Sequence, residues 1–191
     1  MLIFVAGLVV FLGIHSISIV APRWRDAQVG RIGEGPWKGL YSLVSIASFV
    51  AMLYGYGMAR HAPVMVYVPP MALRHLALLL MVPVFPLLIA AYLPGRIRRM
   101  TRNPMLLAVI LWAVAHLSAN GTLNDILLFG GFLVWAVADL ISVSRRARVR
   151  PVPSTPALAI NDVIIVVAGL GLYAYMLLWG HAHMAGVSPL G

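Results

Sequence analysis

The chain has 191 residues, of which 62% are hydrophobic and only 10% are charged, and its formal net charge is +9. A soluble protein of this length needs a charged outer surface, so this composition predicts an integral membrane protein. All fourteen lysines and arginines lie between or beside apolar runs, where they contact headgroups and set topology, so the charge does not indicate nucleic-acid binding. The absence of cysteine excludes disulfides, thiolate-ligated haem, cysteine-held iron–sulfur clusters and covalent c-type haem.

Six apolar segments approach the roughly 20 residues that a helix needs to cross a bilayer. Pro22 ends the first of them. A polar stretch then contains several glycines and Pro36 over residues 30–38, which argues against regular structure there. The sequence therefore predicts an all-α polytopic bundle of six transmembrane helices, forming a single domain over residues 1–191. The expected spans are about residues 2–21, 40–59, 71–93, 104–119, 123–143 and 157–179.

Local signals set the ends and the shape of the later spans. Pro83 and Pro86 should kink the third span and free carbonyls that a neighbouring helix must satisfy. Pro104 suits the first helical position of the fourth span. Residues 122–125 fit a capping box that begins the fifth span. A proline-rich linker follows, and Thr155 is the expected cap of the last helix, which should end near residue 179.

The distribution of basic residues predicts the orientation of the chain in the membrane. The loops after the first, third and fifth spans hold four each, twelve in total, whereas the loop after the second span holds only Arg60 and Arg74. Because basic loops stay on the cytoplasmic side, both termini should face away from the cytoplasm.

Two histidines lie inside apolar spans, where ionisable residues are costly and tend to be functional. They are His15 in the first span and His116 in the fourth. On a helix, His116 shares a face with Trp112 and with the small residues Ala108 and Ala113, which leave room for a flat apolar ligand. Imidazole is a standard axial ligand of haem iron, so the functional hypothesis for these histidines is haem binding. The plainer interpretation is a histidine bonded to a backbone carbonyl in a helix bundle.

The two histidines are expected to lie at different depths in the membrane. His116 lies twelve residues beyond Pro104, about 18 Å along a helix, while His15 lies seven before Pro22, about 10 Å. Axial ligands of one iron need similar depths if the porphyrin stands upright. By depth alone, His75 matches His116 better, so helix arithmetic leaves the second ligand open.

Several stretches, covering nearly the whole chain, resemble the NnrU family of bacterial membrane proteins, which is named for an association with nitrite and nitric oxide metabolism in denitrifying bacteria. They are residues 11–16, 38–45, 91–97, 112–121, 128–130 and 181–189. The pattern is also distantly similar to the zeta-carotene isomerase of plants and cyanobacteria, a membrane enzyme that uses haem b. That likeness implies iron ligands at His15 and His116. Ala113 stands where the isomerase has cysteine, so a thiolate-for-histidine exchange is impossible here.

The leading hypothesis from the sequence is a multi-pass protein of the bacterial inner membrane that binds haem b non-covalently and has both termini in the periplasm. It is expected to contact the lipid bilayer and to bind either NO or a hydrophobic polyene as a small-molecule ligand. A respiratory or redox protein is its expected protein partner. One alternative is a haem-dependent cis–trans isomerase of a carotenoid-like polyene, and another is a cofactor-free partner in membrane assembly. The expected haem contacts are His15, His116, Trp112, Ala113, Ala108 and Phe11.

Overall fold

The computed structural model describes residues 1–145 and 158–190, and every regular element in these ranges is helical. This confirms the all-α prediction. The chain divides into two compact units, one of residues 1–68 with 120–142 and the other of residues 69–119 with 143–191. The proline-rich linker and Thr155, the expected cap of the last helix, lie outside the described residues.

In the described part of the chain, five helical segments are long and apolar enough to cross a membrane. The fourth predicted span forms α7 (Pro104–Ala119), which begins at the expected proline but has only 16 residues. The helices therefore lie close to the predicted spans, and α7 is the shortest of them. The five long segments are α1 (Leu2–Val20), α3 (Glu34–Ala59), α4 with α5 (Met71–Ala90), α8 (Leu123–Arg145) and α9 through α10 (Ala159–Ala185).

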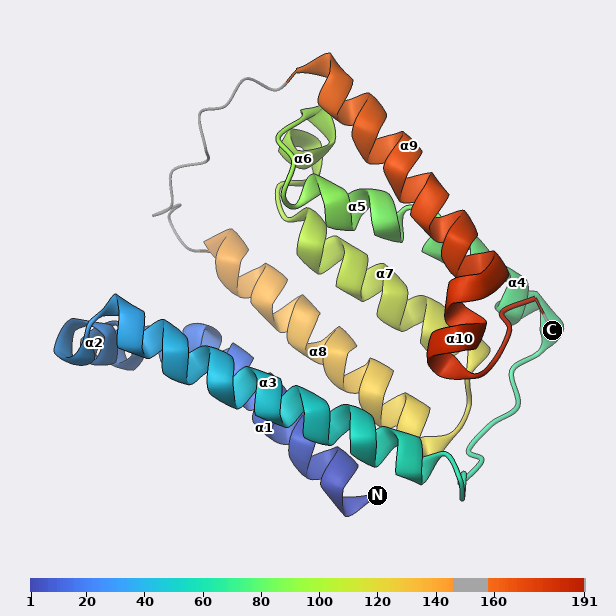
Figure 1. Ribbon diagram of the computed structural model, residues 1–191, viewed down its shortest axis with the longest axis horizontal. Coiled ribbons are helices and arrows are strands. Elements are labelled where there is room, and N and C mark those ends of the chain that lie inside the picture. The colour runs from blue at the N-terminus through green and yellow to red at the C-terminus, as the bar shows by residue number, and fades with distance from the viewer. Residues whose placement is uncertain (146–157, 191) are drawn as a thin grey trace. The chain divides into compact units, whose positions relative to one another are not determined.

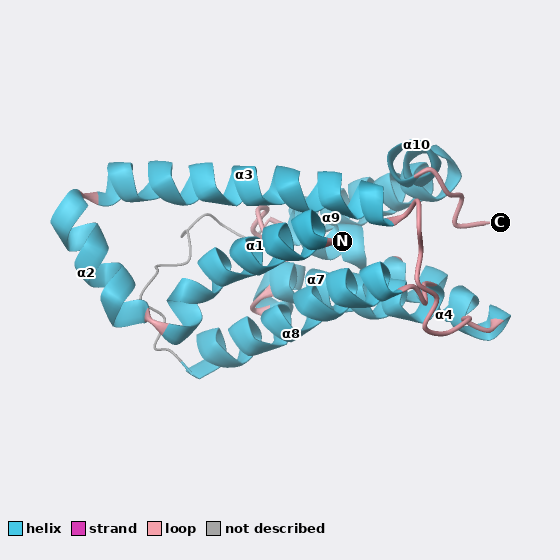
Figure 2. Cartoon of the chain, turned by 90° about the horizontal axis from the view of Figure 1, so that it is seen from below, coloured by secondary structure: helices cyan, strands magenta, loops and turns pink. Residues whose placement is uncertain are grey.

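The stretch expected to be irregular between the first two spans is helical instead, so that prediction was wrong. It forms α2 (Pro22–Ile32) and the first turn of α3, and Figure 2 shows α2 joining α1 to α3 at one end of the first unit. The prolines fit because Pro22 and Pro36 each lie in a first helical turn, where no hydrogen bond from their nitrogen is needed. Only Gly33, with φ of 87°, breaks the helix.

In the first unit α1 and α3 lie side by side, as Figure 1 shows. Two glycines allow this close approach: a Cβ on Gly7 would lie 2.5 Å from the backbone nitrogen of Met52, and one on Gly55 would lie 2.3 Å from that of Phe4. Phe4 and Met52 are 0% and 2% exposed, so the contact is closed to solvent and lipid alike. Small residues at a helix crossing are the usual means by which membrane helices pack closely.

Polar contacts tie the loop after α3 to the start of α8. The backbone N–H groups of Val66 and Tyr67 donate to the carbonyl of Gly121 at 2.9 and 3.1 Å. One half of the predicted capping box is present, since the Asp125 N–H donates to Thr122 Oγ1, and the Thr122 hydroxyl in turn donates to the Asp125 carboxylate. The Tyr56 hydroxyl donates to the same carboxylate, so Asp125 anchors α3 to α8.

The second unit contains the predicted kink, between α4 (Met71–Met81) and α5 (Val84–Ala90). At the break the Val82 N–H donates to Leu79, three residues back, which releases the Leu78 carbonyl from its regular helical partner. The Tyr173 hydroxyl, from α9 (Ala159–Tyr175), donates to that carbonyl at 2.9 Å. The expectation that a neighbour satisfies a freed carbonyl is thus confirmed.

The beginning of α9 is fixed to the short basic helix α6 (Arg96–Thr101). The Asp162 carboxylate accepts hydrogen bonds at 3.1 Å from the backbone N–H groups of Arg96 and Ile97, the unsatisfied donors of the first turn of α6. The Asn161 amide donates to the Pro94 carbonyl at 2.6 Å. Further along α9, a Cβ on Gly169 would lie 2.5 Å from the backbone nitrogen of Pro86, so α5 and α9 also approach closely.

The last span continues past its predicted end at residue 179. After α9 the chain makes one π-helical turn, η1 (Met176–Gly180), and then α10 (His181–Ala185). Gly180 continues the helix because its missing Cβ makes room for the Tyr175 ring and the Met176 sulfur, which a Cβ would approach to 2.8 and 2.6 Å. The helix ends instead at Gly186, whose φ of 70° is a left-handed C-cap.

Candidate functional site

His116 lies in the last turn of α7, half-buried. Its Nδ1 hydrogen-bonds the Trp112 carbonyl at 2.8 Å, and the two rings have centres 5.2 Å apart. A carbonyl only accepts, so in the neutral ring Nδ1 carries the proton and Nε2 carries the lone pair. The carbonyl contact of the plainer interpretation is present, and it is also the contact that orients a metal-binding histidine.

A second histidine of the same unit faces His116. His181, the first residue of α10, has its ring centre 6.3 Å from that of His116, and the ring planes differ by 26°. Its Nδ1 hydrogen-bonds the Val187 carbonyl at 2.7 Å, which gives His181 the same tautomer as His116. His181 lies beyond the predicted end of the last span at residue 179, so the predicted spans do not bring it to His116.

The small residues expected to flank a ligand on α7 are fully buried in protein. Ala108 and Ala113 are both 0% exposed. Ala108 packs in a core cluster with Val84 and Leu87 of α5, and Trp112 lies partly buried against this cluster. These contacts pack the turns of α7 that precede His116 against α5.

His15 lies in the first unit, within a group of aromatic rings. Its Nδ1 hydrogen-bonds the Phe11 carbonyl at 2.7 Å, and the Phe11 ring centre is 4.2 Å away. Tyr41 of α3 and Trp135 of α8 lie at ring-centre distances of 5.3 and 6.0 Å. The buried Nε1 of Trp135 has no hydrogen-bond partner among the described residues.

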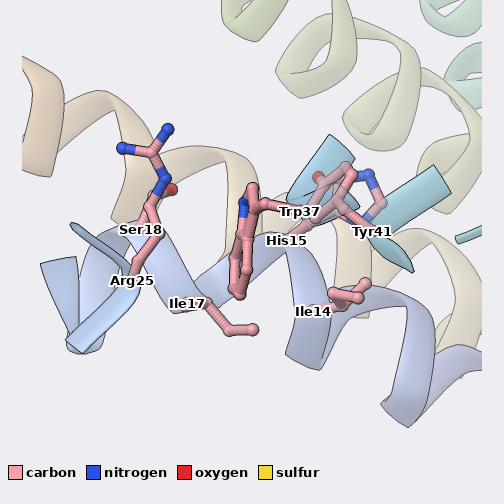
Figure 3. A pocket seen from close by; sticks show the side chains of 7 residues that line it. All are labelled: Ile14, His15, Ile17, Ser18, Arg25, Trp37 and Tyr41. Carbon is pink, nitrogen blue, oxygen red and sulfur yellow. The ribbon is translucent and has the colours of Figure 1, made fainter. Parts of the chain in front are cut away.

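A cavity of about 40 Å³ lies beside His15, and Figure 3 shows the side chains of α1, α2 and α3 around it. This volume holds only a few water molecules, so a porphyrin does not fit inside it. A larger apolar groove of about 660 Å³ runs between α1 and α8, within the range of small-molecule sites. The small cavity beside His15 is lined by Ile14, His15, Ile17, Ser18, Arg25, Trp37 and Tyr41.

The predicted ligands are therefore distributed over two units. His15 belongs to the first unit and His116 to the second, so their pairing on one iron stays a prediction. His75, the alternative chosen by depth, is exposed on α4 of the second unit.

A haem is compatible with this set of residues, whereas a bare metal ion has less support. No group of three or more histidine, cysteine or acidic side chains that could hold an ion occurs within residues 1–145 and 158–190. Haem iron needs only one or two axial side chains, because the porphyrin supplies the other four donors. His116, whose Nδ1 is held by the Trp112 carbonyl, is a residue of the type that could supply such a donor.

One comparison with known proteins gives a match that spans almost the whole chain. The family model described as NnrU protein matches residues 3–189. No curated protein and no solved structure matches the chain.

Proposed function

The chain belongs to the NnrU family, and from this premise we propose that it is a membrane protein that binds haem b non-covalently through histidine. His116 is one axial ligand. The observation that carries this proposal is the hydrogen bond from Nδ1 to the Trp112 carbonyl, which leaves Nε2 as the lone-pair nitrogen and fixes the plane of the ring.

The resemblance to the haem-dependent isomerase implies His15 as the second ligand. His15 shares the hydrogen-bonded Nδ1 of His116, through the Phe11 carbonyl at 2.7 Å, which supports this role. His75 is the alternative that depth favours. In either pairing the chain supplies ligation and an apolar surround, and the haem supplies the redox or nitric oxide chemistry that the family name suggests.

The decisive experiment is the absorption spectrum of detergent-purified protein in its oxidised and reduced forms. Two histidine ligands should give the sharp visible bands of a six-coordinate, low-spin haem b after reduction. Protein that stays colourless after expression with a haem supply and after reconstitution with hemin would contradict the proposal. It would leave the cofactor-free assembly partner as the better description.

The apolar groove between α1 and α8 favours a second candidate, cis–trans isomerisation of a polyene taken from the bilayer. Three glycines help to line the groove, and a Cβ on Gly13 or Gly130 would meet no atom of the described chain within 4 Å. An extended hydrocarbon would therefore meet little steric resistance there. Product analysis after incubation of the haem-loaded protein with a cis-carotenoid separates this candidate from a haem protein without isomerase activity.

The orientation of the chain is testable on its own. The asymmetry of twelve basic residues against two predicts that a reporter fused after the last residue is non-cytoplasmic. Paired alkaline phosphatase and fluorescent-protein fusions should show phosphatase activity and little fluorescence. The reverse result would contradict the predicted orientation, and it would mean either an odd number of crossings or an inverted chain with both termini in the cytoplasm.

A further inference from the structure

We propose that the basic surface of α6 binds a phospholipid whose headgroup carries two phosphates, as in cardiolipin. This surface consists of the side chains of Arg96, Arg98, Arg99 and Arg102. None of the four is a proposed haem contact, so this lipid site is separate from the proposed haem site.

Helix α6 lies at a membrane boundary. Residues 91–95 join it to the end of the apolar segment Met71–Ala90, and α7 begins at Pro104 on its other side. Figure 1 shows α6 beside the start of α9, where the Asp162 carboxylate accepts hydrogen bonds from the first backbone N–H groups of α6. Asp162 thus holds α6 by its backbone, at the depth where phospholipid headgroups lie.

The arginines of α6 point away from the protein. Ile97 packs against the core cluster of the second unit. At 100° per residue, Arg96, Arg98 and Arg99 fall within an arc of about 160° centred opposite Ile97. Arg96, Arg99 and Arg102 are exposed and Arg98 is half-buried, in agreement with this geometry.

The charge of this surface is not neutralised by ion pairs. The stretch after α1 also holds four basic residues, but two of them have carboxylate partners: Arg25 pairs with Asp26 at 2.9 Å and Lys38 with Glu34 at 2.8 Å. No ion pair of the described residues involves the arginines of α6. Four like charges within residues 96–102 repel one another, so a bound anion stabilises them.

Arg102 occupies a backbone conformation that favours glycine. Its φ of 60° and ψ of −48°, with a hydrogen bond at 2.6 Å from the Asn103 N–H to the Thr101 carbonyl, describe a classic γ-turn, which is rare and strained. Glycine adopts positive φ without a Cβ penalty. The strained arginine therefore needs an offsetting gain, and a phosphate bound to its side chain supplies one.

The spacing of the arginines suits two phosphates. Arg96 and Arg99 are three residues apart and Arg98 and Arg102 are four apart, so each pair has Cβ atoms about 5–6 Å apart on one side of the helix. Guanidinium groups bind phosphate oxygens bidentately, so each pair can hold one phosphate. When both phosphates belong to one headgroup, binding of the second becomes intramolecular, which favours a two-phosphate lipid over separate one-phosphate lipids.

Exposed apolar side chains beside the arginines favour a lipid over a soluble anion. Tyr92, shortly before α6, is 78% exposed, and Met100, within α6, is 83% exposed. A headgroup bound to the arginines brings acyl chains to these side chains, whereas a soluble phosphate leaves them in water. Basic surfaces between membrane helices are a recognised kind of site for such headgroups.

The test is native mass spectrometry of the full-length protein in detergent, with cardiolipin or phosphatidylglycerol added at equal phosphate. We expect one cardiolipin to bind more tightly than phosphatidylglycerol by about a hundred-fold, the lower end of the gain from linking two binding groups. Arg98→Gln with Arg102→Gln should weaken cardiolipin binding by about twenty-five-fold, or about five-fold for each arginine. The matched control, Arg23→Gln with Arg31→Gln, removes the same charge from exposed side chains of α2 and should leave binding unchanged.

Arg102→Gly separates lipid binding from folding. Glycine relieves the strained turn, so the thermal midpoint should stay the same or rise, while cardiolipin affinity falls by about five-fold. Loss of affinity without loss of stability cannot come from unfolding.

Three results would overturn the proposal. The first is equal binding of the two lipids at equal phosphate. The second is an equal loss of cardiolipin binding in the α2 control, which would indicate a general effect of net charge. The third is full displacement of cardiolipin by inorganic pyrophosphate at equal phosphate, which would assign the surface to a soluble anion.

Discussion

Replacing His116 by alanine is expected to remove most of the bound haem. This histidine is common to every ligand pair of the proposed function, whether its partner is His15 or His75. Without His116 the iron would keep at most one axial histidine. Loss of a contact that merely supports a metal ligand lowers affinity by about ten- to a hundred-fold, and loss of the ligand itself should lower haem affinity by at least as much. Haem content per protein after purification, measured from the pyridine haemochrome, checks this.

The structure indicates that this variant should fold. Residues that pack α7 onto its neighbours, such as Leu106, Ala108 and Ala113, lie well before His116 and are buried, whereas His116 is only half-buried in the last turn. The His116→Ala protein should therefore elute and melt like the unmodified one. If it retains full haem and an unchanged low-spin spectrum, His116 is not an axial ligand.

Much of the fold could be predicted because its signals are local. Proline at the first position of α7, the Asp125–Thr122 half of the capping box and the proline kink after α4 each depend on a few adjacent residues, and each is present in the structure. The same reasoning failed where glycine and proline were taken as breaks. Pro36 lies in the first turn of α3, so it does not break that helix.

The candidate site could be predicted only in part. A polar ring in an apolar span identified His15 and His116, because that signal lies in each segment alone. The closeness of His116 and His181 depends on the π turn and on how α9 packs against α5, neither of which shows in hydrophobic periodicity. Because the last helix was predicted to end near residue 179, nothing in the sequence brought His181 close to His116.

Gly55→Ala is expected to disrupt the contact between α1 and α3, with a large loss of stability. The new Cβ would lie 2.3 Å from the Phe4 nitrogen and 2.6 Å from its Cα, and backbone atoms cannot move aside as the end of a flexible side chain can. Relief requires the helices to separate, which would open the contact around Phe4 and Met52. Overpacking of this kind typically costs about 1–3 kcal/mol, and a backbone clash belongs at the upper end of that range.

Gly57→Ala is the matched control, because it lies on the same helix two residues later and its Cβ would meet no atom of the described chain within 4 Å. Alanine is the better helix former by about 0.5–1 kcal/mol, so this variant should be neutral or slightly more stable. Thermal unfolding in detergent, followed by circular dichroism, should show a clear fall in midpoint for Gly55→Ala alone. Equal midpoints for the two variants would contradict the close crossing of α1 and α3.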